Sequence, residues 1–203
     1  MIEWATNTKV NSEFYKTTMR SLRAKYEHIV GIENLTEYKE FEIPCIVEKI
    51  LERKVNRILD FGTGTSCLPA YLNQNFTMYE VWALDDGSWH PEVNEKSYNN
   101  AYHTNIRYVT ADILKNSDCV PDDYFDVIYS ASVLEHVLHP EEYIKALDKK
   151  LKKGGWQIHL VDWDEVYHPL DFKKLTQEEI GDPPEDLYSP DGVISRIAIC
   201  SQK

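Results

Sequence analysis

Residues 57–66 read RILDFGTGTS, and this stretch decides the fold. A short apolar run that ends at Phe61 predicts a strand buried on both faces of a sheet. Gly62 and Gly64 follow, and two glycines at such spacing allow the backbone to turn tightly and to approach a ligand closely. We therefore expect a buried strand that runs into a glycine-rich turn at the start of a helix.

Strands and helices alternate on either side of this turn. Short apolar runs predict strands at residues 57–61, 79–85, 106–112, 125–130, 156–161 and 193–200. Apolar side chains at three-and-four spacing, together with helix start and stop signals, predict helices at 11–30, 38–53, 66–74 and from Pro140 to a cap at Gly154, with a short one at 176–180. This alternation predicts an α/β fold with a doubly wound sheet of parallel strands.

An acidic residue at the end of the second strand indicates a ligand that contains a ribose. Asp85 lies where a carboxylate can accept hydrogen bonds from both ribose hydroxyls. The third glycine of a dinucleotide fingerprint is replaced by Cys67, which weakens the alternative of a nicotinamide-dependent oxidoreductase. The sequence also lacks the Gly-Lys pair of a phosphate-binding loop, so nucleoside triphosphate hydrolysis is disfavoured.

Three motifs in this order resemble those of class I (Rossmann-like) S-adenosylmethionine-dependent methyltransferases. Asp60, Gly62 and Gly64 are similar to the first motif, an acidic residue followed by GxG. ALDD (83–86) resembles the ribose-binding end of the second strand, and TADI (110–113) resembles the third motif, whose acidic side chain meets the adenine amino group. The resemblance implies S-adenosylmethionine as the cofactor.

The next stretch narrows the resemblance to the small-molecule, UbiE-like subfamily. FDVIYSASVLEHVLHP (125–140) and LKKGGW (151–156) are similar to its fourth strand, the helix after it and the lead-in to its fifth strand. The family implies a mostly parallel Rossmann-like sheet with an antiparallel C-terminal strand and N-terminal helices. We expect one methyltransferase domain over 1–203, with a helical extension (1–54), a cofactor-binding core (55–163) and a shortened C-terminal part (164–203). The closing strand hairpin of the family is not evident in the last part, which leaves the sixth strand unassigned.

The resemblance also implies a set of site residues and a reaction. The residues expected around the cofactor are Asp60, Phe61, Gly62, Gly64, Asp85, Asp86, Asp112, Ile113 and Ser130. The expected reaction is methyl transfer to an oxygen or nitrogen atom of a small metabolite or of a sugar or lipid precursor. The alternative is a non-catalytic S-adenosylmethionine-binding or partner-regulating subunit, and an RNA methyltransferase is a weaker one.

His136 is the candidate catalytic base, because it is expected in a helix after the fourth strand and imidazoles titrate near neutral pH. The alternative is that its ring only packs beside the cofactor. Some relatives hold a divalent ion with Glu-x-x-Glu-His, and Ser132 stands here where the first glutamate would be, which leaves Glu135 and His136. Since a hard cation needs anionic oxygen ligands, we predict no metal site. Trp89, in the loop after Asp85, is a candidate to stack near the adenine.

Composition sets the remaining expectations. The net charge of −12 disfavours nucleic acid as a partner and favours a small-molecule substrate, with one basic helix stripe at 16–25 as the local exception. No apolar run approaches the roughly 20 residues that span a bilayer, and no secretory signal is evident, so no membrane association is expected. Four widely spaced cysteines in 203 residues fit a reducing cytoplasm. A homo-oligomer is left open.

Overall fold

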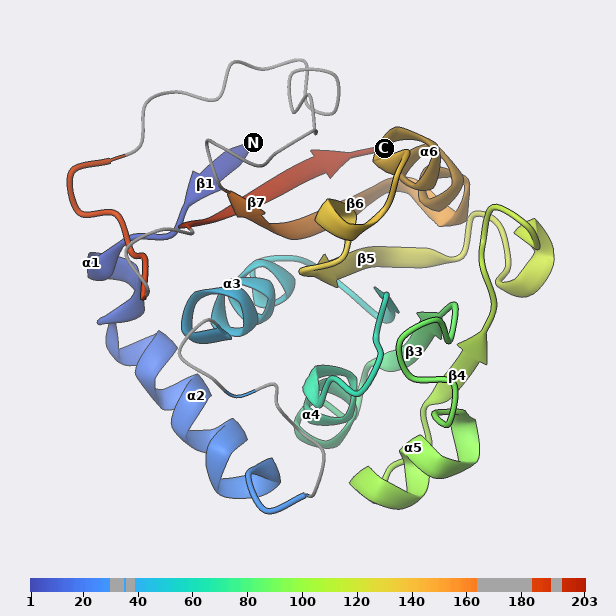
Figure 1. Ribbon diagram of the computed structural model, residues 1–203, viewed down its shortest axis with the longest axis horizontal. Coiled ribbons are helices and arrows are strands. Elements are labelled where there is room, and N and C mark those ends of the chain that lie inside the picture. Colours follow the sequence, from blue (N-terminus) through green and yellow to red (C-terminus); the bar gives the residue numbers. More distant parts are fainter. Residues whose placement is uncertain (30–34, 36–38, 164–183, 191–194) are drawn as a thin grey trace.

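A seven-stranded sheet with helices on both faces organises the chain (Figure 1). The computed structural model describes residues 1–29, 35, 39–163, 184–190 and 195–203. The strand order is β1-β7-β6-β5-β2-β3-β4. The strands are β1 (Ile2–Trp4), β2 (Arg57–Phe61), β3 (Glu80–Asp85), β4 (Arg107–Thr110), β5 (Phe125–Ala131), β6 (Leu151–Trp163) and β7 (Ser195–Gln202).

The sheet is parallel from β6 to β4 and antiparallel at β7. This arrangement confirms the predicted Rossmann-like α/β fold with an antiparallel C-terminal strand. The chain leaves β2 toward β3 on one side and returns through β5 on the other, so the strand order reverses next to β2. In open α/β sheets, ligands bind at the carboxyl ends of the strands at such a reversal.

Residues 1–54 were expected to form a purely helical extension, but the segment also contains a strand. Ile2–Trp4 form β1, which pairs antiparallel with β7 and therefore runs in the same direction as β6. Lys49 of α3 forms an ion pair with Glu3 at 2.8 Å and thereby ties β1 to the helix behind it. A three-residue strand shows no hydrophobic periodicity in the sequence, which is why the prediction missed it. The edge of the sheet beyond β7 is thus formed by the beginning of the chain.

The helices cover the two faces unequally in the described part of the chain. They are α1 (Asn7–Val10), α2 (Glu13–Tyr26), α3 (Lys39–Leu51), α4 (Leu68–Asn75), α5 (Glu95–Tyr102) and α6 (Pro140–Lys150), with 3-10 turns η1 (Ser117–Cys119) and η2 (Leu134–His136). Figure 1 shows α3, α4 and α5 on one face, with α2 outside α3, and α6 on the other. Among these described helices, none is long and apolar enough to cross a membrane.

Alternate side chains of each strand enter two separate cores. On β2, Ile58 belongs to the core under α3 and α4, whereas Leu59 belongs to the core under α6. On β5, Val127 and Ile128 divide in the same way. Because both faces are buried, these strands read as continuous apolar runs rather than as alternating ones.

Two local predictions are wrong, and one helix was not predicted. The helix that begins at Pro140 ends at Lys150, so Gly154 does not cap it and instead lies within β6 with φ +80°. His136 lies in the 3-10 turn η2 rather than in an α-helix. Helix α5 was not predicted, although Asn94 forms a capping box at its start, because its sequence EKSYNNAY carries little apolar periodicity. The short helix expected at 176–180 lies outside the described residues.

Asp126 of β5 fastens the beginning of β2 to the sheet. Its Oδ2 accepts hydrogen bonds from the backbone N–H groups of Asn56 at 2.9 Å and Arg57 at 2.8 Å, and its Oδ1 pairs with Lys152 at 2.7 Å. Partial burial alone would raise the pKa of Asp126, but Lys152 and the two backbone donors outweigh it, and the pKa is lowered. The carboxylate therefore stabilises the fold in its ionised form.

Candidate functional site

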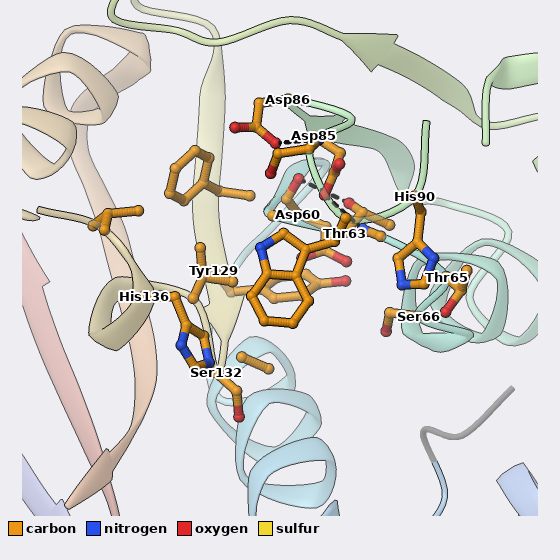
Figure 2. A pocket seen from close by; sticks show the side chains of 18 of the residues that line it. Asp60, Thr63, Thr65, Ser66, Asp85, Asp86, His90, Tyr129, Ser132 and His136 are labelled. Carbon is orange, nitrogen blue, oxygen red and sulfur yellow. Dashed lines mark hydrogen bonds between the residues drawn. The ribbon is translucent and has the colours of Figure 1, made fainter. Parts of the chain in front are cut away.

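A cavity of about 360 Å³ lies at the carboxyl ends of β2, β3, β4 and β5. Phe61, Asp85, Ala111 and Ala131 line it at the ends of these four strands or just beyond them. Figure 2 shows Asp85 and Asp86 at one end of the cavity, opposite Ser132 and His136. The position beside the strand reversal is the one expected for a ligand site in this architecture.

The glycine-rich turn after β2 approaches the cavity with its backbone. Gly62 adopts φ +73°, and a Cβ built on it would lie 2.5 Å from Cγ2 of Val133. Gly64 adopts φ +49°, and its N–H donates to Oδ2 of Asp85 at 2.8 Å. A side chain at Gly62 would therefore meet both a backbone conflict and a steric one. The positive φ of Gly62 and its close contact with Val133 explain why this turn needs glycine.

Asp85 is held in place by backbone donors at both of its carboxylate oxygens. Besides the bond from Gly64, its Oδ1 accepts from the N–H of Gly87 at 2.8 Å. Each carboxylate oxygen has a second lone pair, so both can still accept from a ligand. Asp86 is exposed on the cavity rim, where its Oδ1 accepts from the N–H of Ser88 at 2.8 Å. The end of β3 thus offers a carboxylate that is fixed before any ligand arrives.

Asp60 places a buried carboxyl group against the floor of the cavity. Burial raises the pKa of Asp60 well above its usual range, although the nearby hydroxyl groups of Thr63 and Tyr129 act in the opposite direction. Its Oδ2 has no hydrogen-bond partner within the described ranges, although the atom is buried. An unpaired buried carboxyl oxygen costs free energy unless a ligand supplies a partner.

Asp112 and Ile113 form the wall after β4. Burial would raise the pKa of Asp112, but the hydrogen bond and charge of Lys115, whose Nζ lies 2.9 Å from Oδ2, lower it overall. Oδ1 accepts from the N–H of Leu114 at 2.9 Å. Ile113 is buried and presents an apolar surface to the cavity. A flat, partly apolar group with a polar edge fits beside this pair.

The opposite end of the cavity contains polar groups from three elements. Ser132, just after β5, adopts φ +54°, and its Oγ donates to Oε1 of Glu42 at 2.8 Å. Nζ of Lys39 donates to the same Oγ at 2.9 Å. The imidazole of His136 lines this end and lies beside the exposed indole of Trp89, with 5.6 Å between the ring centroids. His136 therefore lines this end of the cavity, and Trp89, from the loop after β3, lies beside it.

Ser130 is the predicted site residue that the structure places elsewhere. It is fully buried within β5, and its Oγ lies 2.8 Å from Nδ1 of His159. Nε2 of His159 faces Oε1 of Gln157 at 2.9 Å, so Nε2 carries the proton and Ser130 donates to Nδ1. Burial lowers the pKa of His159 to about 4, which keeps the ring neutral. These three residues form a hydrogen-bonded network inside the sheet. The side chains immediately before and after Ser130 line the cavity instead.

The other predicted site residues lie together. The cavity is lined by Asp60, Phe61, Gly62, Gly64, Asp85, Asp86, Asp112, Ile113 and His136. The sequence reasoning missed Thr63, Thr65 and Ser66, which stand in the same turn and could have been found from it. It also missed Lys39, because nothing in a lysine at the start of a helix indicates that it meets a turn far along the chain.

Comparison with known proteins assigns the family. Residues 36–182 match the model of a family described as "Methyltransferase domain". The chain belongs to the methyltransferase-domain family. The resemblance to class I, UbiE-like methyltransferases stated from the motifs is thereby confirmed.

Two curated methyltransferases illustrate the relationship. The chain is 31% identical over 170 residues to the ubiquinone/menaquinone biosynthesis C-methyltransferase UbiE of Vibrio parahaemolyticus, which covers 80% of this chain and 61% of that protein. It is 28% identical over 99 residues to a malonyl-[acyl-carrier protein] O-methyltransferase of Paenibacillus sp., covering 49% of this chain and 36% of that protein. The chain thus spans less than two thirds of the length of these relatives.

Solved methyltransferase structures share the fold. A SAM-dependent methyltransferase from Aquifex aeolicus superposes with a TM-score of 0.54 at 15% identity, over 92% of this chain and 96% of that one. A putative sarcosine dimethylglycine methyltransferase from Galdieria sulphuraria gives 0.56 at 17% identity, over 81% of this chain and 64% of that one. At these identities the likeness concerns the fold, and it agrees with the sheet described above.

Proposed function

We propose that this domain binds S-adenosylmethionine in the cavity at the ends of β2 to β5 and transfers its methyl group to an oxygen or nitrogen atom of a small molecule. The acceptor would be a small metabolite or a sugar or lipid precursor. The observation that carries the proposal is the pairing of the glycine turn with Asp85, because the 2.8 Å bond from Gly64 fixes a carboxylate beside a backbone that approaches a ligand closely. Family membership supports the same chemistry.

The residues present fit S-adenosylmethionine. The cofactor has a ribose diol, for which Asp85 supplies two acceptor oxygens, and an adenine, for which the polar edge of Asp112 and the apolar face of Ile113 are suited. Its methionine part carries an ammonium group, and the buried Oδ2 of Asp60 lacks a partner in the part of the chain that the structure describes. A cationic ligand also suits a cavity whose rim carries the carboxylates of Asp85 and Asp86.

The protein aligns the two reactants and provides a side chain that can accept a proton. Methyl transfer from a sulfonium requires in-line approach of the acceptor and no covalent attachment to the enzyme, so alignment within an enclosed site accounts for much of the rate. When bound, S-adenosylmethionine supplies the electrophilic methyl group. We assign the acceptor to the end of the cavity where Ser132 and His136 lie, and the imidazole of His136 accepts the proton that an O–H or N–H acceptor must lose.

Overall charge and cysteine chemistry support a small-molecule acceptor in a reducing compartment. With a net charge of −12, the surface does not favour the phosphates of nucleic acids. Cys45, Cys67, Cys119 and Cys200 all have free thiols, as proteins of the cytoplasm generally do.

Calorimetric titration of the purified chain with S-adenosylmethionine and S-adenosylhomocysteine tests the proposal, with NAD as the control dinucleotide. We expect both sulfur ligands to bind with dissociation constants on the order of micromolar, about 8 kcal/mol of binding free energy, and NAD to give no heat of binding. A well-folded protein that binds neither sulfur ligand would refute the proposal. Tighter binding of NAD would point to the oxidoreductase alternative.

A further inference from the structure

Three tyrosine hydroxyl groups hold the backbone of the glycine-rich turn after β2. They belong to Tyr98 and Tyr102 of α5 and to Tyr108 of β4, and we call these residues the tyrosine group. Their hydroxyls donate to the carbonyl oxygens of three consecutive residues: Tyr98 to Ser66, Tyr102 to Thr65 and Tyr108 to Gly64. The turn that lines the cavity is therefore bonded to two elements that follow it in the chain.

The members of the tyrosine group pack against one another. Tyr98 and Tyr102 are four residues apart in α5, so their side chains leave the same face of the helix. The ring centroid of Tyr98 lies 4.5 Å from that of Tyr102 and 5.3 Å from that of Tyr108. All three residues are buried in the core under α3 and α4, and they are not among the residues that line the cavity. A ligand in the cavity therefore reaches the turn but not the tyrosine group.

The hydroxyls of the tyrosine group act as donors. Burial raises the pKa of Tyr98, Tyr102 and Tyr108 well above the usual tyrosine value, and it is the largest cause in each case. Each hydroxyl therefore keeps its proton at neutral pH and above. A neutral tyrosine has one O–H to donate, and here a carbonyl oxygen of the turn accepts it.

The helix after the turn cannot supply these hydrogen bonds itself. In a continuous helix, the carbonyl oxygen of Thr65 would accept from the N–H of residue 69, but residue 69 is a proline and has no N–H. The carbonyl oxygen of Gly64 would accept from Leu68, but the N–H of Leu68 donates to Oγ of Ser66 at 3.3 Å. These two oxygens therefore depend on donors from outside the helix, and the tyrosine group provides them.

Gly64 is held at both its N–H and its C=O group. The N–H donates to Oδ2 of Asp85 at 2.8 Å, and the carbonyl oxygen accepts from Tyr108 at 3.0 Å. Gly64 has φ +49°, and glycine adopts many other backbone conformations almost as easily. The hydroxyl of Tyr108 therefore acts through Gly64 on the carboxylate of Asp85, which we assign to the ribose.

We propose that Tyr98, Tyr102 and Tyr108 are positioning residues for the cofactor, because their hydroxyls hold the glycine-rich turn in its ligand-binding conformation before the ligand arrives. This inference rests on the proposed function and deepens it. A site that is ordered in advance loses less conformational entropy on binding. Removal of a hydroxyl should therefore weaken binding, although the tyrosine group does not touch the ligand. A purely structural role would lower stability and leave the affinity of the folded protein unchanged.

Calorimetric titration of phenylalanine variants with S-adenosylhomocysteine tests the inference. Tyr102→Phe removes one hydroxyl and keeps the ring. We expect it to bind the ligand about fivefold more weakly, since the usual contribution of one hydrogen bond corresponds to about this factor in a dissociation constant. The double variant Tyr102→Phe/Tyr108→Phe should bind about 20-fold more weakly, because a second carbonyl oxygen of the turn is released.

Tyr26→Phe is the matched control. The hydroxyl of Tyr26 donates to Oε1 of Gln74 at 2.9 Å and not to the turn, and its ring centroid lies 5.7 Å from that of Tyr102 in the same core. This variant should lose about as much urea midpoint as Tyr102→Phe, but it should keep its affinity for S-adenosylhomocysteine within about twofold. Equal losses of affinity in Tyr26→Phe and Tyr102→Phe would overturn the inference, because they would show a general effect of the core.

Amide hydrogen exchange across residues 62–70 gives a second readout. Without ligand, this segment should exchange about tenfold faster in the double variant than in the unmodified protein, because the turn is released. With saturating S-adenosylhomocysteine, the ligand holds the turn, and the two proteins should agree within about twofold. Tyr26→Phe should follow the unmodified protein in both states. Equal exchange of the two ligand-free proteins would contradict the proposed role.

The outcomes separate this inference from the proposed function. A folded double variant that binds S-adenosylhomocysteine as tightly as the unmodified protein would overturn the inference while the cofactor site stands. Failure of the ligand to bind the unmodified protein would overturn the proposed function itself. If the double variant does not fold, Tyr98→Phe and Tyr108→Phe are measured singly, each with an expected loss of about fivefold. Unchanged affinity in both single variants would then overturn the inference.

Discussion

Replacement of Gly62 by alanine should damage both the fold and the cofactor site. The residue has φ +73°, and a left-handed conformation costs a residue with a Cβ about 1–2 kcal/mol. The new Cβ would also lie 2.5 Å from Cγ2 and 2.6 Å from Cγ1 of Val133, so that side chain must move. Inserting a methyl group into a packed site costs about 1–3 kcal/mol. We therefore expect Gly62→Ala to lower the free energy of unfolding by about 2–5 kcal/mol.

Gly154→Ala is the matched control, because it isolates the backbone contribution. Gly154 has φ +80°, but the nearest atom to its built Cβ is Nε2 of Gln202 at 3.9 Å, which is an ordinary contact. Urea denaturation followed by tryptophan fluorescence should show a loss of only about 1–2 kcal/mol for this variant. Val133 lines the cavity, so Gly62→Ala should also weaken binding of S-adenosylhomocysteine, whereas Gly154→Ala should not. Equal losses of stability in the two variants would refute the argument from close packing at Gly62.

Three further predictions concern single side chains. Asp85→Asn should weaken S-adenosylhomocysteine binding about 10- to 100-fold by calorimetry, because it removes charge-assisted hydrogen bonds worth about 1.5–3 kcal/mol, and Asp118→Asn, an exposed control, should not. Asp126→Asn should destabilise the protein by about 1–3 kcal/mol at pH 7. The pKa of Asp126 is lowered in the folded state, so its contribution is full above the usual aspartate pKa of about 4 and is lost as the pH falls through the lower folded pKa. The urea midpoints of the two proteins should therefore converge as the pH falls below that folded pKa. Trp89 is 76% exposed at the cavity, so S-adenosylhomocysteine should change the intrinsic fluorescence, and Trp89→Phe should abolish that change while Trp156→Phe preserves it.

The parts of the fold that sequence reasoning predicted are those with strong local signals. The buried strand before Gly62 and the strand that ends at Asp85 both appear as expected, because apolar runs bounded by turn residues have few other interpretations. The amphipathic helix from Pro140 also begins where its proline and first-turn glutamates indicate. Its end was misplaced, since LKKGG reads as a helix terminus, whereas pairing with β5 draws Leu151 into β6.

The end of the cavity that holds Asp85 could be predicted from the sequence, and the end that holds Ser132 could not. Asp60, Asp85 and Asp112 each lie at or near the end of a strand, and parallel strands bring such positions to one edge. By contrast, the meeting of Glu42 with Ser132 depends on how α3 packs over β5, which no local pattern encodes. A short strand such as β1 is missed for the same reason, because its conformation is set by its partner β7.

A crystal structure of the chain with S-adenosylhomocysteine tests the central claim most directly. We predict the ligand in the cavity at the carboxyl ends of β2 to β5, with both ribose hydroxyls on Asp85, the adenine beside Asp112 and Ile113, and the ammonium group nearest to Oδ2 of Asp60. The sulfur should face the end of the cavity that holds Ser132 and His136. A ligand bound elsewhere, or with its ribose away from Asp85, would contradict the account.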